Sequence, residues 1–364
     1  MLRLGIVGGN RGFLIHQLCN HIKDRIKITA VADVAEDALS QWKHLDETIQ
    51  RYNSLEQMLT HAHINAVYIC TPAPDHANQA VKALISGLHV LSAVPACMTI
   101  DECFSLIKTA RKSDKMYMLA ENYCYIPENK WINEQCHQGN IGEITYIRGA
   151  YIHDCKSLMF SGKDLTWRGE LSRTLVGNVY PTHTIGPIAQ WLDINKHDGD
   201  RFKSIRSFTT AQKSLAAYAA SKFGNGHPYA SNDFFCRGDM SFSLIETEKG
   251  RIIELIYDTH SNRPASKSEY YIQGTKACYI SGRYTGESAI FWSAASEDAV
   301  FQNVNLPSDT YDPDLNLLRD FINAIETETP SPIGVLDAVT WSSIIPLSEK
   351  SINNNNEAIS FPEF

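Results

Sequence analysis

The first 120 residues alternate between short apolar stretches and amphipathic stretches, and this alternation constrains the fold more than any other feature of the chain. Helical patterns run from about 13 to 23, 35 to 43, 75 to 86 and 100 to 112. The stretches between them that are typical of buried strands are LRLGIV, KITAVAD, AVYIC, HVLSAV and MYML. Strands that are apolar on both faces and separated by helices form a parallel sheet covered on both sides. The sequence therefore predicts a doubly wound α/β domain over residues 1–123.

A glycine cluster follows the first of these strands directly. It consists of Gly8, Gly9, Asn10, Arg11 and Gly12. Free backbone N–H groups at the positive end of the next helix can bind the diphosphate of a dinucleotide there. A regular G-x-G-x-x-G motif counted from the first glycine would need two further glycines where Asn and Phe stand. A tight turn without a cofactor therefore stays open as the alternative.

Two more loops lie at the same predicted edge of the sheet. Asp33 ends the second strand, 25 residues after Gly8, where a carboxylate can accept hydrogen bonds from both hydroxyls of an adenosine ribose. No Lys or Arg stands beside it, which favours NAD over NADP; the alternative for Asp33 is a plain helix cap. The next loop contains Thr71, Pro72 and His76, which we expect to contact the cofactor. The alternative for His76 is an ordinary surface residue.

The segment VGNVYPTHTIGPIAQWL, residues 176–192, combines the pattern of a buried helix with two groups that can transfer protons. Tyr180 and His183 are three residues apart, so we expect them on the same face of the first helical turn. Asn178 and Pro181 are expected to fix the start of that turn. A hydrogen-bonded structural role is the alternative for the histidine.

Composition limits the class of protein and its partners. The 364 residues suggest two domains, and a formal net charge of −8 without a basic run argues against nucleic acid or an anionic membrane as a partner. No signal-peptide pattern or long apolar run occurs, so we expect a cytoplasmic protein that binds a small molecule. The nine cysteines never form a C-x-x-C pair, and we expect reduced thiols and no metal site. His61-Ala-His63 and His153-Asp154-Cys155 are interpreted as a loop and a strand end.

Many separated motifs together resemble one known family. GIVGGNRG, Asp33, TPAPDHA, HVLSAVPA and LAENYCY resemble the Gfo/Idh/MocA family of nicotinamide-dependent oxidoreductases, whose first domain is of Rossmann type. Within it the chain is most similar to glycoside hydrolase family 109, the NAD-dependent glycosidases typified by alpha-N-acetylgalactosaminidase. The matching stretches are VPA at 94–96, ENYCY at 121–125, GAYIHD at 149–154, GNVYPTH at 177–183, INKHDGDRF at 194–202, GDM at 238–240 and WSSIIPLSEKS at 341–351.

The resemblance implies a second, α+β domain with an open, mostly antiparallel sheet, which we place at residues 124–364. Strand patterns support it at ITYIRGAYI, SIRSFTTA, DMSFSLIET, GRIIELIYD, SEYYIQG and KACYIS. Leu315 to Ile325 and Leu336 to Leu347 are expected to be helices, and these C-terminal helices can pack back on the first domain. Residues 212–235 have no strong period and are expected to form a mobile loop. We also expect a homo-oligomer.

The resemblance further implies a redox route for cleaving a glycoside. The sugar is oxidised at C3, deprotonated at C2, loses its C1 substituent, adds water or another nucleophile and is reduced again, so NAD ends unchanged. His183 would take the C3 hydroxyl proton, Tyr151 would act near the C2 proton, and Tyr180 would bind the same sugar. Trp167 and Arg168 match a pair that lines the cleft, where the cation can balance substrate or diphosphate charge. Glu121 and Asn122 match residues near the nicotinamide ribose, Glu121 with a catalytic role, and Pro95 belongs to a cofactor loop.

The chain also departs from the family. Ala93 and Val94 replace the Glu and Lys that precede this proline in relatives, and the lysine is the catalytic base of the sugar dehydrogenases in the wider family. Leu175 replaces a basic residue, and YDPDL at 311–315 replaces an H-G-G-x-D segment that contacts the sugar. A simple NAD-dependent sugar dehydrogenase or reductase stays open as an alternative. So does a non-catalytic sugar or nucleotide sensor.

Overall fold

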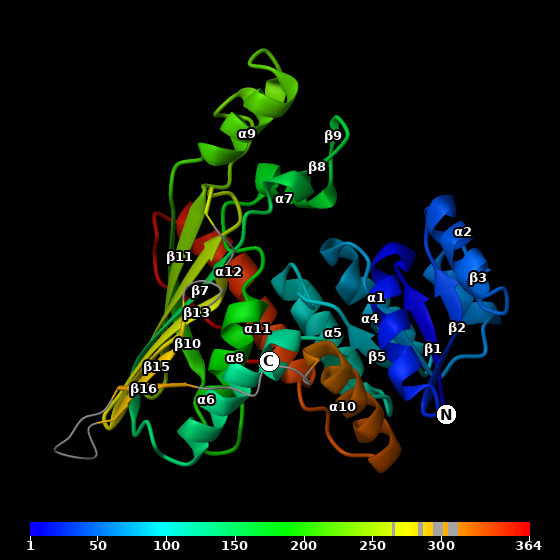
Figure 1. The fold of residues 1–364 in the computed structure, drawn as a ribbon, viewed down its shortest axis with the longest axis horizontal. Helices are drawn as coiled ribbons and strands as arrows, with labels where there is room; N and C mark the ends of the chain where they lie inside the picture. The colour runs from blue at the N-terminus through cyan, green and yellow to red at the C-terminus, as the bar shows by residue number, and fades with distance from the viewer. Residues whose placement is uncertain (264–265, 283–286, 294–300, 305–311) are drawn as a thin grey trace. The chain divides into compact units, whose positions relative to one another are not determined.

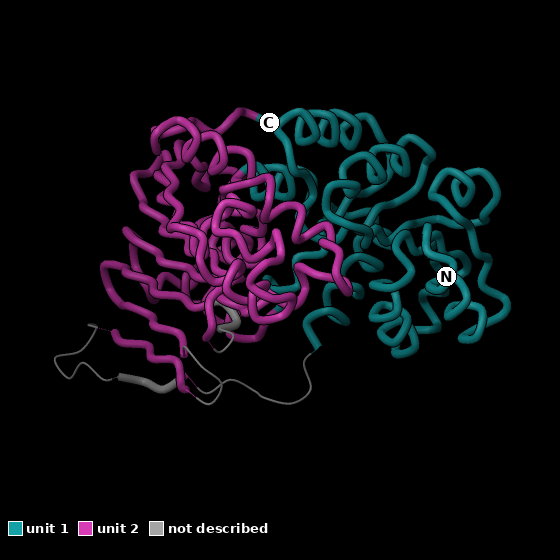
Figure 2. The backbone as a smooth tube through the Cα atoms, turned by 90° about the horizontal axis from the view of Figure 1, so that it is seen from above, with its two compact units in different colours: residues 1–125, 310–343, 364 teal, residues 126–309, 344–363 magenta. Residues whose placement is uncertain are grey.

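The computed structural model describes residues 1–263, 266–282, 287–293, 301–304 and 312–364. The chain forms two compact units, coloured separately in Figure 2. Unit 1 contains Met1–Tyr125, Thr310–Ser343 and Phe364, and unit 2 contains Ile126–Asp309 and Ile344–Glu363. A segment close to the C-terminus therefore belongs to the same unit as the N-terminus.

Unit 1 is built on a six-stranded parallel sheet, as the alternating pattern predicts (Figure 1). The strand order is β3-β2-β1-β4-β5-β6, so the chain reverses direction across the sheet between β1 and β4. The strands are β1 (Leu2–Val7), β2 (Ile26–Ala32), β3 (Gln50–Tyr52), β4 (Ala66–Ile69), β5 (His89–Ser92) and β6 (Tyr117–Leu119). In such sheets ligands bind at the carboxyl ends of the strands, at the point of reversal. That point is where β1 leads into the glycine cluster.

The helices of unit 1 are α1 (Gly9–Cys19), α2 (Glu36–Leu45), α3 (Leu55–His61), α4 (His76–Ile85), α5 (Ile100–Lys112), α10 (Pro313–Thr327) and α11 (Val335–Ser342). The short β3 and α3 were not predicted because they contain little apolar periodicity. The expected start of the first helix at residue 13 was wrong: α1 begins four residues earlier, inside the glycine cluster. Glycine is a poor helix former, so its propensity does not indicate a helix at this point. The close packing of the first turn of α1 against the sheet nevertheless requires glycine there.

Unit 2 contains a nine-stranded sheet, in the order β16-β15-β14-β13-β7-β12-β11-β10-β17. All of its pairings are antiparallel except β12 with β7, which confirms an open, mostly antiparallel sheet. The strands are β7 (Ile144–Ile152), β10 (Phe202–Thr209), β11 (Met240–Thr247), β12 (Ile252–Asp258), β13 (Ser266–Gly274), β14 (Ala277–Ile280), β15 (Ile290–Ser293), β16 (Phe301–Asn303) and β17 (Ile359–Ser360). A separate small hairpin pairs β8 (Phe160–Ser161) with β9 (Asp164–Leu165).

The helices of unit 2 are α6 (Pro127–His137), α7 (Trp167–Thr174), α8 (Thr182–Trp191), α9 (Ser214–Phe223) and α12 (Ile344–Asn353). The single helix expected from 336 to 347 is two helices, α11 and α12. Pro346 has no N–H to donate to the carbonyl of Ser342, so one helix cannot run through this point. Within the described ranges, no helix is both long enough and apolar enough to cross a bilayer.

The prediction of a mobile loop at 212–235 was wrong. This segment forms α9, which buries Leu215 and Ala219 in an apolar cluster with Phe160 and Phe235. Figure 1 shows α9 at one end of the unit 2 sheet, beside α7 and the β8–β9 hairpin. The aromatic partners are spread from position 160 to 235, so the apolar face of α9 has no local periodic signal.

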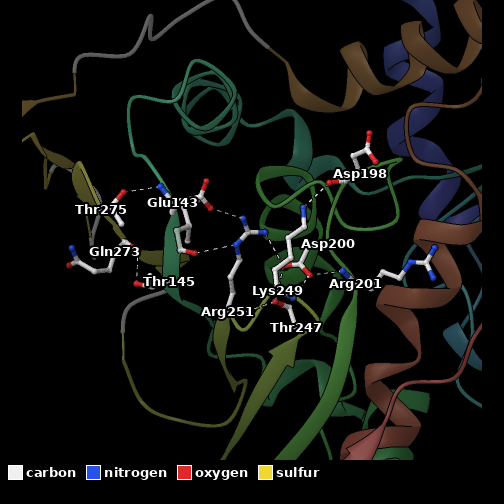
Figure 3. Close-up of polar contacts among 11 residues, drawn as sticks. Glu143, Thr145, Asp198, Asp200, Arg201, Thr247, Lys249, Arg251, Gln273 and Thr275 are labelled. Atoms are coloured by element: carbon white, nitrogen blue, oxygen red, sulfur yellow. Dashed lines mark hydrogen bonds and ion pairs between the residues drawn. The ribbon is translucent and has the colours of Figure 1, made fainter.

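The family-matching segment at 194–202 is a structural connection (Figure 3). The carboxylate of Asp200 is buried and accepts hydrogen bonds from Thr247 Oγ1 at 2.7 Å and Arg251 Nη1 at 2.8 Å. It also accepts the backbone N–H groups of Arg201 and Lys249. These bonds tie the entry of β10 to the β11–β12 turn, so the motif fixes strand register rather than a ligand.

Candidate active site

Neighbouring atoms lie so close to two glycines of the cluster that any side chain at these positions would collide with them. Gly8 has φ of +104°, and a Cβ there would lie 2.8 Å from the carbonyl carbon of Cys70. A Cβ on Gly12 would lie 2.3 Å from Ile6 Cγ2, so this glycine lets α1 pack on β1. The irregular glycine spacing thus still provides a tight turn at Gly8 and a close helix–strand contact at Gly12, two features of dinucleotide-binding loops.

Asp33 is joined to this turn. Its Oδ2 accepts the N–H of Gly9 at 2.6 Å, and its Oδ1 accepts the N–H of Ala35 at 2.8 Å. The residue in the N-cap position of α2 is Ala35, so the helix-cap interpretation of Asp33 does not hold. The buried Trp42 also supports the turn, because its Nε1 donates to the carbonyl of Gly9 at 2.9 Å. Asn10 and Arg11, in the first turn of α1, are exposed.

His76 is buried, so its interpretation as a surface residue is wrong. Its Nδ1 lies 2.8 Å from the carbonyl oxygen of Pro95, and its Nε2 lies 2.8 Å from that of Thr71. Burial lowers the pKa of His76. Both ring nitrogens are thus engaged by backbone, and His76 connects the two loops instead of presenting a free nitrogen to a ligand. Pro72 is exposed, and Pro95 is buried after a cis peptide bond.

Glu121 follows β6 and is fully buried. Its Oε1 accepts the N–H of Tyr123 at 3.1 Å, which shapes the short turn that begins at Asn122. A carboxylate buried in a turn at this edge of the sheet is placed to hold the backbone rather than to meet solvent.

In unit 2 the structure brings together the three side chains expected to bind and convert the substrate. The ring centroid of Tyr151 lies 5.5 Å from that of His183 and 6.2 Å from that of Tyr180, and the Tyr180 and His183 rings are 5.0 Å apart. All three are half-buried. The hydroxyl of Tyr151 also lies 3.4 Å from Nδ1 of the exposed His153. We call Tyr151, Tyr180 and His183 the aromatic triad.

The expectation that Tyr180 shares the helix face of His183 was wrong. The helix α8 begins at Thr182, with Pro181 as its N-cap, so Tyr180 lies in the preceding loop. Asn178 acts before the helix as well, because its Oδ1 accepts the N–H of Tyr180 at 3.1 Å. This local turn, rather than helical spacing, places the tyrosine ring against the histidine.

Two contacts distant in sequence hold the triad in place. Glu349 on α12 accepts the N–H groups of Val176 at 2.7 Å and Gly177 at 2.9 Å, which fixes the loop before Tyr180. On β7, a Cβ at Gly149 would lie 2.5 Å from Thr184 Cγ2, so this glycine lets α8 approach the strand that carries Tyr151. The sequence contains both residues within matched motifs, but only the folded chain shows what they contact.

Trp167 and Arg168 stand in the first turn of α7. The Arg168 guanidinium lies 4.1 Å from the centroid of the Trp167 ring, a cation–π contact in which both side chains are half-buried. Leu175 directly follows this helix, and Tyr311 lies outside the described residues.

The remaining cysteine and histidine clusters carry no ligand arrangement. Asp154 is paired with the buried Lys156 at 2.7 Å. No group of three or more His, Cys, Asp or Glu side chains in the described ranges is arranged to hold a metal ion. None of the nine cysteines forms a disulfide within the described ranges.

Both parts of the chain match known family models. Residues 2–121 match "Oxidoreductase family, NAD-binding Rossmann fold", and residues 130–315 and 311–364 match "Glycosyl hydrolase 109, C-terminal domain". The chain is 31% identical to Glycosyl hydrolase family 109 protein 2 of Phocaeicola vulgatus, covering 100% of this chain and 94% of that protein. It is 32% identical to an alpha-N-acetylgalactosaminidase of Bacteroides fragilis, covering 100% of this chain and 92% of that one.

Solved structures show the same fold at lower identity. A levoglucosan dehydrogenase in complex with NADH superposes with a TM-score of 0.82 at 16% identity, covering 100% of both chains. An oxidoreductase domain protein from Kribbella flavida gives a TM-score of 0.81 at 16% identity, covering 100% of this chain and 99% of that one. The chain therefore belongs to glycosyl hydrolase family 109, as an enzyme whose first unit is the NAD-binding Rossmann domain of the Gfo/Idh/MocA oxidoreductases.

Proposed function

We propose that this enzyme hydrolyses a glycoside of an N-acetylated hexose by transient oxidation of the sugar at C3. The observation that carries the proposal is the aromatic triad, in which an imidazole and two phenols lie within 5.0 to 6.2 Å of one another, measured between ring centroids. Relatives that match the full chain are named alpha-N-acetylgalactosaminidases, which supports the substrate class.

In this proposal the two proton transfers belong to different residues. His183 accepts the C3 hydroxyl proton, because an imidazole can do so near neutral pH. Tyr151 removes the proton at C2, which becomes acidic once C3 is a ketone, and the C1 substituent then leaves. Tyr180 contacts the same sugar and restricts its orientation. Addition of water at C1, return of a proton to C2, and return of the hydride to C3 and of a proton to its oxygen would complete the hydrolysis.

The residues of unit 1 fit the cofactor that this route requires. A bound nicotinamide would supply the hydride acceptor that this route needs, and the same hydride would be available for the final reduction. The first-turn N–H groups of Asn10 and Arg11 would hold the diphosphate, since the N–H of Gly9 is taken by Asp33. Asp33 would accept the ribose hydroxyls with its remaining lone pairs. Thr71, Pro95, Glu121 and Asn122 would form the nicotinamide end, with His76 fixing two of these loops.

A test with one aryl glycoside separates this proposal from its alternatives. The enzyme is incubated with 4-nitrophenyl N-acetyl-α-galactosaminide and NAD+, and nitrophenolate and NADH are followed together. Release of nitrophenolate without net NADH supports hydrolysis. Stoichiometric NADH identifies a dehydrogenase, and the 4-nitrophenyl glycosides of other sugars are then compared. Binding of NAD+ without turnover of any sugar in the panel would favour a sensor.

The C2 step has its own signature. Tyr151 removes a proton that exchanges with solvent, so substrate deuterated at C2 should lose deuterium during turnover. Complete retention of deuterium in the product would exclude the elimination route.

A further inference from the structure

Arg237 is a buried cation with no carboxylate partner in the part of the chain that the structure describes. Its side chain is 2% exposed, and it lies in the short segment between α9 and β11. Among the described residues it forms no ion pair, and its Nε and Nη1 have no hydrogen-bond acceptor. Burial of an uncompensated guanidinium is costly, and a structural role alone can be met by an apolar side chain of similar size. The positive charge itself therefore calls for an explanation.

The neighbours of Arg237 in sequence already have structural roles. A Cβ on Gly238 would lie 2.0 Å from the carbonyl oxygen of Thr210, so glycine is required by this approach. Asp239 accepts the N–H of Ser214 at 2.9 Å and so caps α9. Neither contact involves the guanidinium.

The guanidinium instead joins the two parts of the substrate site. On one side, Arg237 Nη2 donates to Ser172 Oγ, and its backbone N–H donates to the carbonyl of Ser172 at 3.1 Å. Ser172 Oγ in turn donates to the carbonyl of Arg168 at 3.1 Å, so the contact reaches the helical turn that carries the Trp167–Arg168 pair. Arg237 thereby holds α7.

On the other side the guanidinium is next to Tyr257, whose ring stacks on that of Tyr151 in the aromatic triad. Its central carbon is 5.7 Å from the centroid of the Tyr257 ring. Tyr257 is the register partner of Tyr151 on the adjacent strand, and the two rings stack at 6.3 Å with an interplanar angle of 9°. The cation is thus within about 12 Å of the Tyr151 ring, the sum of these two distances.

A third neighbour, His260, does not share the positive charge of Arg237. His260 Nε2 lies 3.4 Å from Arg237 Nη2, and burial together with the cations of Arg237 and Lys156 holds the pKa of His260 well below its usual value. The imidazole is therefore neutral and accepts from the guanidinium. Lys156 does not take over the role, since it is paired with Asp154.

From this geometry we propose that Arg237 is a positioning residue: it fixes α7 against the sheet and provides the positive charge that favours ionised Tyr151. The proposal rests on the proposed function, in which Tyr151 is the base at C2. A phenol is a poor base near neutral pH unless a nearby cation favours the phenolate. Other titratable groups around Tyr151 are His153, Tyr180, His183 and Tyr257, and Arg168 is a second cation that acts on Tyr257. Glu269, opposite Ala150 on the neighbouring strand, is paired with Arg148 and Arg263.

The test is a spectroscopic titration of Tyr151 in the full-length enzyme without NAD or sugar. Ultraviolet absorbance of tyrosinate is recorded against pH for the native enzyme and for Tyr151→Phe, and their difference isolates one phenol. The same difference, with and without Tyr151→Phe, is then measured in two variant backgrounds. Arg237→Gln removes the positive charge, and Arg237→Lys keeps it. A unit charge at this distance and an effective dielectric constant of about 20 should raise the midpoint by about one pH unit in the Gln variant. The Lys variant should stay close to the native enzyme.

Arg173→Gln is the matched control, because it removes the same charge from the exposed face of α7, where Arg173 is paired with Glu170. Its midpoint should not move. If Arg237→Gln fails to fold, as judged by circular dichroism, Arg237→Met takes its place. A folded neutral variant with an unchanged Tyr151 midpoint overturns the proposal.

Turnover gives a second, separable readout. With 4-nitrophenyl N-acetyl-α-galactosaminide and NAD+, the rise of kcat/KM with pH should shift upward by about one unit in the Gln variant, so activity near neutral pH falls about tenfold and recovers at higher pH. A loss that is equal at every pH contradicts the charge effect. The titration needs no turnover. Failure of the enzyme to cleave any glycoside of the panel would therefore overturn the proposed function and leave the role of Arg237 to be decided by the titration.

Discussion

At the scale of single residues, the side chains that the sequence marks as functional are supported by contacts it does not reveal. Tyr151, Tyr180 and His183 come from a strand, a loop and a helix, yet their rings meet. Their sequence positions could be predicted because chemically active residue types stand out within motifs. Two supporting residues could not be predicted: Glu349, which fixes the loop before Tyr180, and Trp42, which supports the glycine turn of unit 1. Their hydrogen bonds span more than thirty residues and carry no periodic signal.

His183→Ala should abolish glycoside turnover while NAD binding is kept. Loss of a general base typically costs 10²–10⁴ in rate, and His183 lies outside unit 1. Initial rates measure glycoside turnover, and the change in protein fluorescence on titration with NAD measures binding. His197→Ala, at an exposed position of the same unit, is the control. Full activity of the His183 variant would remove it from the catalytic site.

Asp33→Ala should weaken NAD binding more than NADP binding. The carboxylate can accept the ribose hydroxyls and repels a 2′-phosphate, so its loss should cost NAD about tenfold or more in affinity and narrow the gap between the coenzymes. Dissociation constants for both, measured by calorimetry, provide the comparison. An equal loss for both would indicate that Asp33 only supports the turn through Gly9.

At the scale of elements, agreement with the sequence depends on how far apart the determining contacts are. The predicted bounds of α5 and β7 are confirmed to the residue. The start of α5 is marked by a local capping box between Thr99 and Glu102, and β7 by its apolar pattern. In contrast, α9 is stabilised by aromatic residues far along the chain. The break between α11 and α12 is explained by Pro346 in the first turn of α12, which one long apolar pattern conceals.

Gly149→Ala should displace α8 from β7. The new methyl group would meet Thr184 and Ile188, so we expect a loss of about 1–3 kcal/mol in the free energy of unfolding. Glycoside turnover should fall further than stability explains, since the same helix carries His183. Urea denaturation and initial rates test this. Gly226→Ala, where a Cβ would contact nothing within 4 Å, should change neither quantity.

The start of α6 should make stability depend on pH. Burial raises the pKa of Glu128 from 4.5 to about 7, and its carboxyl accepts a hydrogen bond from the buried Tyr279. Between these values the native state binds more protons than the unfolded state, so this contribution to stability is full below pH 4.5 and is lost as the pH rises through 7. The resulting decrease in the free energy of unfolding is at most about 3 kcal/mol.

Denaturation of Glu128→Gln across this pH range checks the assignment. The variant should lose the downward slope that the native enzyme shows on that interval. Glu134→Gln, at an exposed position of the same helix, should keep it. An unchanged slope in Glu128→Gln would assign the dependence to another group.

At the scale of the whole molecule, the prediction of a homo-oligomer remains to be tested. The unit 2 sheet exposes four large apolar side chains, each 38–43% accessible: Phe208, Leu244 and Ile252 on the neighbouring strands β10, β11 and β12, and Ile280 on β14. Large apolar side chains on a solvent-facing sheet are typical of association surfaces. Light scattering during gel filtration should give a mass that is a multiple of the 40.8 kDa chain. A mass of one chain at micromolar concentration would contradict the prediction.

Unit 1 is completed by residues more than 200 positions further along the chain than the groups they bond. Leu119 at the end of β6 donates its N–H to Ile333, and the N–H of Ala96 in the cofactor loop donates to Ser342 Oγ, each at 3.0 Å. During synthesis the ribosome must therefore reach Ser342 before the nucleotide-binding unit can form all of these hydrogen bonds. Until then the nascent N-terminal domain lacks these packing partners, and we expect chaperones to bind the apolar surface that it still exposes.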